Sequence, residues 1–112
     1  MLSYKYDLSL TEQTKLDALI DGKDMETKVV LLVDEEFEIV NKEMFDRMNK
    51  QAFGFEVGSD GDIITDIHYC ELLKRWASCA TLTFSDNTVS FVDVHLAVCI
   101  FYGDFDVILL DK

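Results

Sequence analysis

The stretch that decides the fold is Val29-Val30-Leu31-Leu32-Val33-Asp34-Glu35-Glu36-Phe37-Glu38-Ile39-Val40. Its first five residues form a continuous apolar run that is bounded by charged residues and rich in valine. Such a run is too short for a helix, so residues 29–33 predict a buried strand. The three acids that follow predict a polar turn, and residues 37–40 predict a second strand that returns along the first.

A helix is expected on the N-terminal side of this stretch. Ser9 and Glu12 form a capping box, in which both side chains accept hydrogen bonds from backbone amides at the start of a helix. Gly22 predicts the end of that helix, because glycine readily adopts the left-handed conformation found there. Between these signals, three apolar residues fall on one stripe: Leu16, Leu19 and Ile20.

A second helix is expected on the C-terminal side. Asn41 is a suitable N-cap for a helix over residues 42–52. Its inward face would carry three apolar side chains, Met44, Phe45 and Met48. After it, Gly58-Ser59-Asp60-Gly61-Asp62 is the strongest loop signal in the chain.

A third helix is expected after this loop. Residues 63–65 predict an extended segment, and Asp66 predicts the cap of a helix that ends near Ser78. Large apolar side chains then share one helical face: Tyr69, Leu72, Leu73 and Trp76. Because such a face normally packs on a core, Trp76 is expected to be buried.

The last third of the chain is dominated by apolar residues typical of strands. Residues 81–84 and 89–94 predict a hairpin around the turn at 85–87. Gly103-Asp104 predicts a second, tight hairpin loop, followed by a closing strand at residues 107–110.

The segment 94–101 fits both a buried helix and a central strand, because its apolar pattern is continuous. The turn signals on either side favour the strand. Taken together, residues 1–112 predict one α+β domain, with two or three helices packed on a largely antiparallel sheet.

Acidic residues outnumber basic residues by 22 to 10, so the formal net charge is −12. An apolar content of 49% is too high for a disordered acidic tail. No stretch reaches the roughly 18 uncharged apolar residues of a membrane helix. Nucleic-acid binding requires Lys and Arg to neutralise phosphates, and the scattered cations form no basic stripe. We expect no direct binding to nucleic acid or to membranes.

The cysteines predict a reducing compartment. Cys70, Cys79 and Cys99 are odd in number and have no paired spacing. Isolated cysteines often behave as small buried hydrophobic residues. Residues 1–7 lack the apolar stretch of a signal peptide, so we expect a cytoplasmic protein.

The histidines and cysteines do not predict a metal centre or a cofactor site. His68 and Cys70 are close in sequence, but a structural zinc site needs four ligands, usually in close pairs. Asp60 does not begin a calcium-binding loop, because the glycine at the sixth position of that pattern is replaced by Thr65. We therefore expect no metal and no cofactor.

No catalytic pattern is present either. A nucleophilic pair would need Cys70 or Cys99 beside His68 or His95, and no local signature marks a nucleophile. Glu26-Thr27-Lys28 matches one limb of a metal-dependent nuclease core, but the acidic charge of the chain opposes a nucleic-acid substrate. The protein is expected not to be an enzyme.

Two acidic groups are expected to bind a partner. The first is the turn Asp34-Glu35-Glu36-Phe37-Glu38, in which four acids surround an aromatic residue. The second consists of Asp60, Asp62, Asp66, Tyr69 and Glu71. An acidic rim around an aromatic anchor suits a basic protein, since the charges raise the association rate and the anchor holds the complex. The alternative is that the acids only provide solubility.

In size, acidity and lack of catalytic motifs, the chain is similar to two groups of inhibitors. One group is the bacterial immunity proteins and antitoxins that cap basic nuclease toxins. The other is the phage-encoded acidic proteins that occupy the DNA-binding surface of restriction or CRISPR machinery. The resemblance implies a non-enzymatic inhibitor of a basic protein, with a nuclease toxin as the expected partner. A self-associating scaffold or chaperone is a further alternative, and we expect a monomer or a homodimer.

Overall fold

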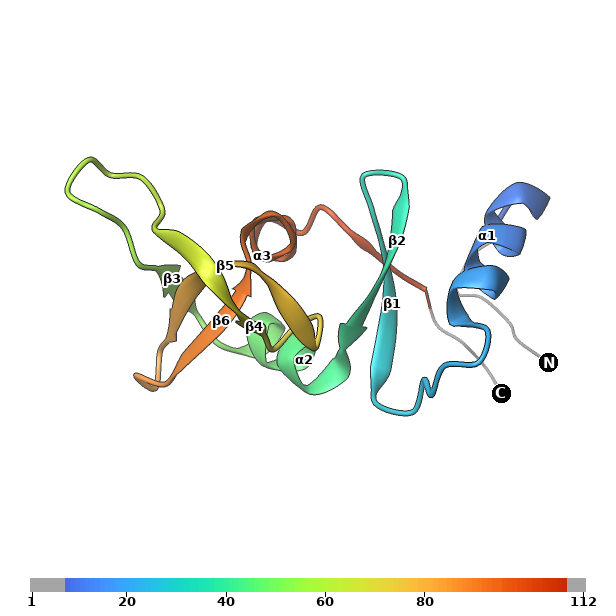
Figure 1. Cartoon of the computed structure of the whole chain (residues 1–112), viewed down its shortest axis with the longest axis horizontal. Helices are drawn as coiled ribbons and strands as arrows, with labels where there is room; N and C mark the ends of the chain where they lie inside the picture. The colour runs from blue at the N-terminus through green and yellow to red at the C-terminus, as the bar shows by residue number, and fades with distance from the viewer. Residues whose placement is uncertain (1–7, 109–112) are drawn as a thin grey trace.

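Residues 8–108, which the computed structural model describes, form three helices and two antiparallel sheets (Figure 1). The first sheet has the order β2-β1-β7 and consists of β1 (Lys28–Val33), β2 (Glu36–Asn41) and β7 (Asp106–Ile108). The second sheet consists of β3 (Phe53–Phe55), β4 (Thr65–Cys70), β5 (Arg75–Phe84) and β6 (Val89–Asp93). The helices are α1 (Leu10–Ile20), α2 (Lys42–Lys50) and α3 (Val94–Tyr102). The predicted α+β class is confirmed, with the strands divided between two sheets.

The two sheets lie at different positions along the long axis of the molecule, which extends 49 Å against 24 Å in each other direction. In Figure 1, α1 lies at one end beside β1 and β2, and the second sheet lies at the other end. Side chains of α2 and α3 share one core with side chains of both sheets, so these two helices join the sheets. None of the described helices is long and apolar enough to cross a membrane.

The strand β1 is buried on both of its faces. Leu31 and Val33 belong to the larger core, which contains α2, α3 and the second sheet. Val30 faces the other way and packs with Leu16 and Ile20 of α1 in a separate cluster. Successive side chains of a strand point to opposite faces, so a strand covered on both sides requires an apolar run without alternation. This explains why residues 29–33 are continuously hydrophobic and confirms the strand predicted there.

The local signals around β1 behave as predicted. Ser9 and Glu12 form the capping box of α1, and Gly22 has a φ of 72° just beyond its end. The side chain of Asn41 accepts a hydrogen bond from the amide of Met44 at the start of α2. The helix α2 ends at Lys50, two residues earlier than predicted.

A loop interrupts one edge of the second sheet. Phe55 of β3 pairs with Leu82 of β5, and Thr65 of β4 pairs with Ala80 of the same strand. Only one residue of β5 lies between these two pairs, so residue 56 alone would be enough to connect β3 to β4. Residues 57–64 instead form an extra loop between the two strands, which we call the excursion (Figure 1). The excursion contains the predicted Gly58–Asp62 loop.

The helix predicted from Asp66 to Ser78 is wrong. These residues form the β4–β5 hairpin, in which Tyr69 pairs with Trp76. The turn between the strands holds Lys74 at a φ of 57° and buries Leu72 completely. The carbonyl of Leu72 also accepts a hydrogen bond from the amide of Asn41. The spacing of the apolar residues fits one face of a helix. In the fold, however, Leu72 is buried and hydrogen-bonded within a turn, and the residues on either side of that turn pair as two strands.

The expected burial of Trp76 is also wrong, because its side chain is 69% exposed. It lies on the outer face of the hairpin, with its ring 6.0 Å from that of Tyr69 in an edge-to-face arrangement. In a hairpin, alternate side chains point away from the core, so Trp76 and Tyr69 share the solvent-facing side.

The strand favoured for residues 94–101 and the hairpin loop at Gly103-Asp104 are both wrong, because this region forms α3. The side chain of Asp93 accepts from the amide of Leu96 and caps the start of the helix. Gly103 has a φ of 76° and ends it. The glycine therefore serves as a helix cap instead of a hairpin residue. The strand predicted at 107–110 overlaps β7 at residues 107 and 108; residues 109–110, like residues 1–7, lie outside the described residues.

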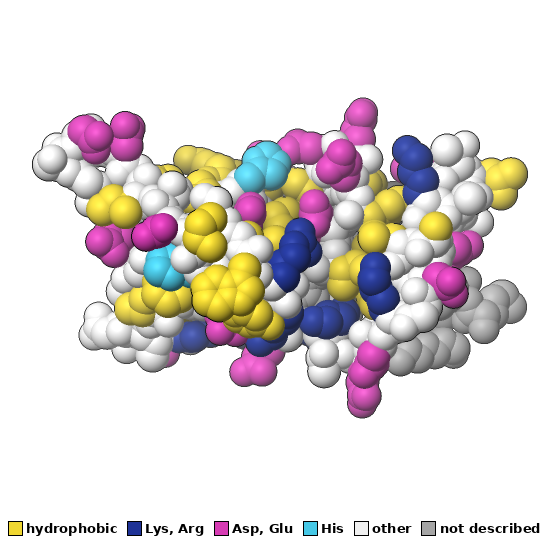
Figure 2. Space-filling view, in the orientation of Figure 1, with side chains coloured by type: hydrophobic (Ala, Val, Ile, Leu, Met, Phe, Trp, Pro, Cys, Tyr) yellow, Lys and Arg dark blue, Asp and Glu magenta, His cyan; other side chains and the backbone are white. Residues whose placement is uncertain are grey.

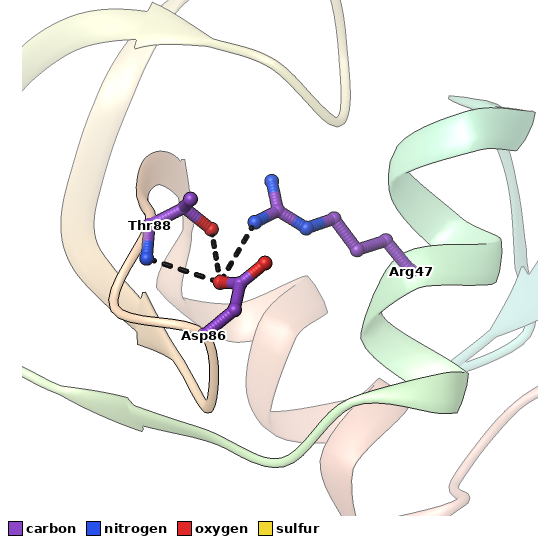
Figure 3. A network of polar contacts seen from close by, with 3 residues as sticks. All are labelled: Arg47, Asp86 and Thr88. Carbon is purple, nitrogen blue, oxygen red and sulfur yellow. Dashed lines mark hydrogen bonds and ion pairs between the residues drawn. The ribbon is translucent and has the colours of Figure 1, made fainter.

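A polar network connects α2 to the predicted hairpin of β5 and β6, which is confirmed (Figure 3). The guanidinium of Arg47 lies 3.9 Å from the ring centre of Phe84 and 3.4 Å from the carboxylate of Asp86. That carboxylate also accepts hydrogen bonds from the hydroxyl and the amide of Thr88. The hydroxyl bond is the main reason why the pKa of Asp86 is below its ordinary value. Asp86 therefore stabilises a turn.

The packing of α1 on β1 predicts unequal effects of truncating two leucines of the same helix. Leu16 is fully buried, whereas Leu10 is 79% exposed. We expect Leu16→Ala to lower the free energy of unfolding by about 2–5 kcal/mol. Leu10→Ala should change it by less than about 0.5 kcal/mol. Denaturant titration of both variants measures this difference, and equal losses would contradict the packing described.

Candidate functional site

The turn between β1 and β2 presents two acids in a strained backbone conformation. Val33 pairs with Glu36, so Asp34 and Glu35 are the only two residues of the loop. Their φ angles are 49° and 65°, the left-handed conformation required at both positions of a type I′ hairpin turn. Residues with a Cβ adopt this conformation at a cost, so the paired strands on either side must hold it. Both carboxylates consequently project from the end of a rigid hairpin.

An acidic hollow of about 500 Å³ lies beside this turn. It is formed by three segments that are distant in sequence: the first turns of α1, the end of β1 with its turn, and the connection from α3 into β7. Its charged lining consists of Glu12, Lys15, Asp34, Glu35, Asp104 and Asp106. Figure 2 shows acidic side chains gathered along the upper edge of the molecule above the β1–β2 turn.

The hollow has a strongly negative charge. Its lining contains five carboxylates and a single ammonium group, that of Lys15. Glu12 accepts a hydrogen bond from the backbone amide of Ser9, and this bond is the main reason why the pKa of Glu12 lies below its ordinary value. Leu32 and Phe105 add apolar surface to the lining. A concave surface lined by one sign of charge concentrates the field, so this site attracts cationic groups.

Asp34 also contacts a histidine and a thiol on the side of α3. Its Oδ2 atom lies 2.7 Å from Nε2 of His95, and Sγ of Cys99 lies 3.9 Å from the same nitrogen. His95 and Cys99 are four residues apart on α3, so they share one face of the helix. His95 and Asp34 are exposed, whereas Cys99 is only 8% exposed. Spacing along the sequence missed this group, because 61 residues separate Asp34 from His95.

The geometry of this group differs from that of a catalytic triad. In a triad, the acid orients the histidine through one ring nitrogen while the nucleophile contacts the other. Here the carboxylate and the thiol both approach Nε2 of His95. If His95 acted as a general base, Nε2 would have to accept the proton of Cys99. The carboxylate of Asp34 is already hydrogen-bonded to that nitrogen. The arrangement therefore brings three ligand atoms together without forming a proton relay.

The other residues of the first predicted group point to opposite faces of the first sheet. Glu36 and Glu38 lie on the face toward α3 and the second sheet, whereas Phe37 packs against the α1 cluster. Burial is the main reason why the pKa of Glu38 is raised, and nearby Glu36 and Asp93 raise it further. Phe37 therefore contributes to a core and is not the exposed aromatic centre of the turn.

The second predicted group lies elsewhere. Asp60 and Asp62 are in the excursion, where a carboxylate oxygen of Asp60 accepts from the amide of Asp62. Asp66 bonds the amide of the next residue, and Glu71 forms an ion pair of 3.0 Å with Lys74. In Figure 1 the tip of the excursion and the β1–β2 turn are well separated along the long axis. The structure therefore does not join the two groups into one surface.

Tyr69, the aromatic member of the second group, belongs to an apolar patch. Ile67, Tyr69 and Trp76 are all exposed on the outer face of the β4–β5 hairpin. Exposed aromatic side chains at the centre of a surface are typical anchors in protein complexes. Sequence reasoning selected Tyr69 but placed Trp76 in the core, because it assumed a helix.

Comparison of the chain with protein-family models, with curated proteins and with solved structures finds no match.

The raised pKa of Glu38 predicts a pH-dependent stability difference. Because its carboxyl holds a proton more readily in the folded than in the unfolded state, the ionised group destabilises the fold as the pH rises above its ordinary pKa. Glu38→Gln should raise the melting temperature at neutral pH, and the gain should shrink toward about pH 4. Glu56→Gln, at an exposed position, is the control. A gain that is equal at both pH values would contradict the assignment.

The exposure of Trp76 predicts its fluorescence. It is the single tryptophan of the chain, so it reports one position. We expect an emission maximum and an acrylamide quenching constant close to those of the chain unfolded in denaturant, because the indole is already in water. A blue-shifted emission with weak quenching would instead indicate a buried ring.

Proposed function

We propose that the protein is a small, non-enzymatic inhibitor that binds a basic protein and occludes its cationic cleft. The observation that carries the proposal is the acidic hollow, in which five carboxylates from three segments face one lysine. A nuclease toxin is the partner that this charge suits best, which would make the protein an immunity protein or an antitoxin.

The hollow is suited to an arginine or lysine side chain of such a partner. Carboxylates bind guanidinium groups in a bidentate manner, and these charge-assisted hydrogen bonds are among the strongest in proteins. The apolar surface of Leu32 and Phe105 can cover the aliphatic part of the same side chain. In a nuclease, those cations normally hold substrate phosphates, so the carboxylates of the inhibitor would take the place of the phosphates.

The charge of the whole chain supports the same proposal. A net charge of −12 attracts a cationic partner over a distance and raises the association rate at low ionic strength. Salt screens exposed charges within about 8–10 Å under physiological conditions. Affinity for the partner should therefore decrease as the salt concentration rises.

The cytoplasm is the compartment that we propose for this interaction. Cys70, Cys79 and Cys99 are all buried, free thiols. Proteins with free thiols are typical of reducing compartments. An antitoxin that acts inside the cell that makes it would need no other location.

Two alternatives involve other partners. A phage-encoded inhibitor of restriction or CRISPR machinery would use the same hollow against a different basic protein. Self-association is favoured by a separate observation, the exposed patch of Ile67, Tyr69 and Trp76. Light scattering of the wild-type protein and of Trp76→Ala distinguishes self-association, because the variant should then dissociate.

The proposed function predicts that charge in the hollow matters more than equal charge elsewhere. In the double variant Glu35→Gln/Asp104→Asn, two carboxylates of the hollow are neutralised. The matched control, Asp60→Asn/Asp62→Asn, removes the same charge from the excursion. Each protein is immobilised on a resin and incubated with a lysate of the organism that makes it. The proteins that the resin retains are then sorted by isoelectric point. The wild-type protein and the control should retain a basic protein, whereas the hollow variant should bind it at least about tenfold more weakly, or ~1.4 kcal/mol.

Salt provides the second measurement. Binding of the captured protein to the wild-type chain should weaken between low and high ionic strength. Equal binding by both double variants, or binding that salt does not change, would contradict the proposal and leave solubility as the role of the acids.

A further inference from the structure

Three side chains with different ligand atoms converge beside the β1–β2 turn. The Oδ2 atom of Asp34, the Nε2 atom of His95 and the Sγ atom of Cys99 all lie within 4.8 Å of one another. Carboxylate oxygen, imidazole nitrogen and thiolate sulfur are the three kinds of protein ligand that zinc accepts. The cluster is thus chemically mixed, unlike the acidic groups on the rest of the surface.

The fold holds these atoms in place from two rigid elements. The N-cap Asp93 sets the first turn of α3, and His95 and Cys99 then project from one face of that helix. Asp34 approaches from the opposite side, on a hairpin turn fixed by the pairing of β1 with β2. Cys99 forms the buried base of the cluster, and the exposed side chains of Asp34 and His95 form its rim. A cation can therefore enter from solvent.

We propose that Asp34, His95 and Cys99 bind Zn²⁺ as a site of three protein ligands with an open fourth position. Ligand atoms around a tetrahedral zinc ion are about 3.3–3.7 Å apart, given bond lengths of about 2.0–2.3 Å. The distance from Asp34 to His95 is 2.7 Å and that from Cys99 to His95 is 3.9 Å. These two distances must change by about half an ångström, and the third, from Asp34 to Cys99, is at most 4.8 Å and must shorten to the same range. Rotation of the exposed side chains of Asp34 and His95 provides these changes.

The position of the histidine contacts supports a metal over a nucleophilic pair. Both Asp34 and Cys99 approach Nε2, the atom that would coordinate the ion. Without a metal, the carboxylate and that nitrogen are joined by a single hydrogen bond. A zinc ion at the centre replaces this hydrogen bond by bonds to all three atoms; the proton on Nε2 leaves to solvent, and the neutral imidazole keeps its proton on Nδ1.

The surrounding charge favours a cation at this point. The carboxylates of Asp34 and Asp93 lie near the thiol of Cys99 and give the cluster a negative potential. A negative potential of this kind attracts a divalent ion. A coordinated thiol loses its proton, so zinc binding would release the proton of Cys99 to solvent while the sulfur gains the bond to the metal.

The sulfur ligand also determines which ions the site should prefer. Thiolates select zinc and related transition metals, whereas Mg²⁺ and Ca²⁺ prefer oxygen ligands in larger number. Three protein ligands with a fourth position left open characterise zinc sites that bind a further molecule, such as water or a group of a partner. The inference does not depend on the proposed inhibitor function, although Asp34 belongs to both sites.

The test uses Co²⁺ as a spectroscopic probe for the zinc site in the untagged 112-residue chain, kept reduced with a phosphine and freed of metal with a chelator. We expect the intense visible bands of four-coordinate cobalt and a near-ultraviolet charge-transfer band from the thiolate. Zn²⁺ should displace the Co²⁺ in a one-to-one ratio, and excess Mg²⁺ should not. Cys99→Ala should abolish the charge-transfer band.

His95→Ala and Asp34→Asn test the other two ligands at exposed positions, where folding should be retained. Each should weaken zinc binding at least about tenfold. The matched controls are His68→Ala and Cys70→Ala, which remove the same side-chain types elsewhere and should leave the band and the affinity unchanged. The hollow variant Glu35→Gln/Asp104→Asn should also keep the charge-transfer band, which separates failure of this site from failure of partner binding.

Three results would overturn the inference: no charge-transfer band in the wild-type protein, a band that persists in Cys99→Ala, or zinc affinity that neither His95→Ala nor Asp34→Asn lowers. The last result would assign metal binding to the acidic surface in general.

Discussion

Burial of β1 on both faces is the constraint on which the rest of the structure depends. Val30 and Leu31 are adjacent and both fully enclosed, yet they belong to different cores. One core attaches α1, and the other attaches α2, α3 and the second sheet. Because one strand supplies both, it sets the position of these elements relative to one another. The turn that ends β1 emerges where they meet, and it carries Asp34 and Glu35 to that point.

The negative charge of the chain has more than one role. Some acids act within single elements: Asp93 caps α3, and Asp86 stabilises a hairpin turn. The hydrogen bonds to Asp86 favour its ionised form and lower its pKa. Around the β1–β2 turn, in contrast, carboxylates from three segments line the acidic hollow. Asp34 lines this hollow and also lies beside the histidine and cysteine of α3, so one strained turn contributes to both groups of side chains.

Local sequence signals were sufficient to predict an element where the pattern fits only one kind of secondary structure. The capping residues Ser9 and Asn41 correctly marked two helix starts. Local signals were insufficient where the same apolar pattern fits both a helix and a strand. Tyr69 and Trp76 have the spacing of a helical face, yet they form a cross-strand pair. Asp93 and Gly103 could have identified α3, since an N-cap and a left-handed glycine bracket it, but Gly103 followed by an acid resembled a hairpin loop.

The sequence by itself determined the excess of acids, the capped ends of α1 and α2 and the doubly buried strand, because neighbouring residues specify these features. Only the tertiary structure decided which acids gather in the hollow and which side chains lie beside them. Asp34 and His95 are 61 residues apart, and the distance between Nε2 of His95 and Oδ2 of Asp34 depends on how α3 packs beside the first sheet. Trp76 is exposed for a related reason: the burial of Leu72 places the turn, and the indole then points to the solvent. Such positions result from packing between elements, which spacing along the chain does not encode.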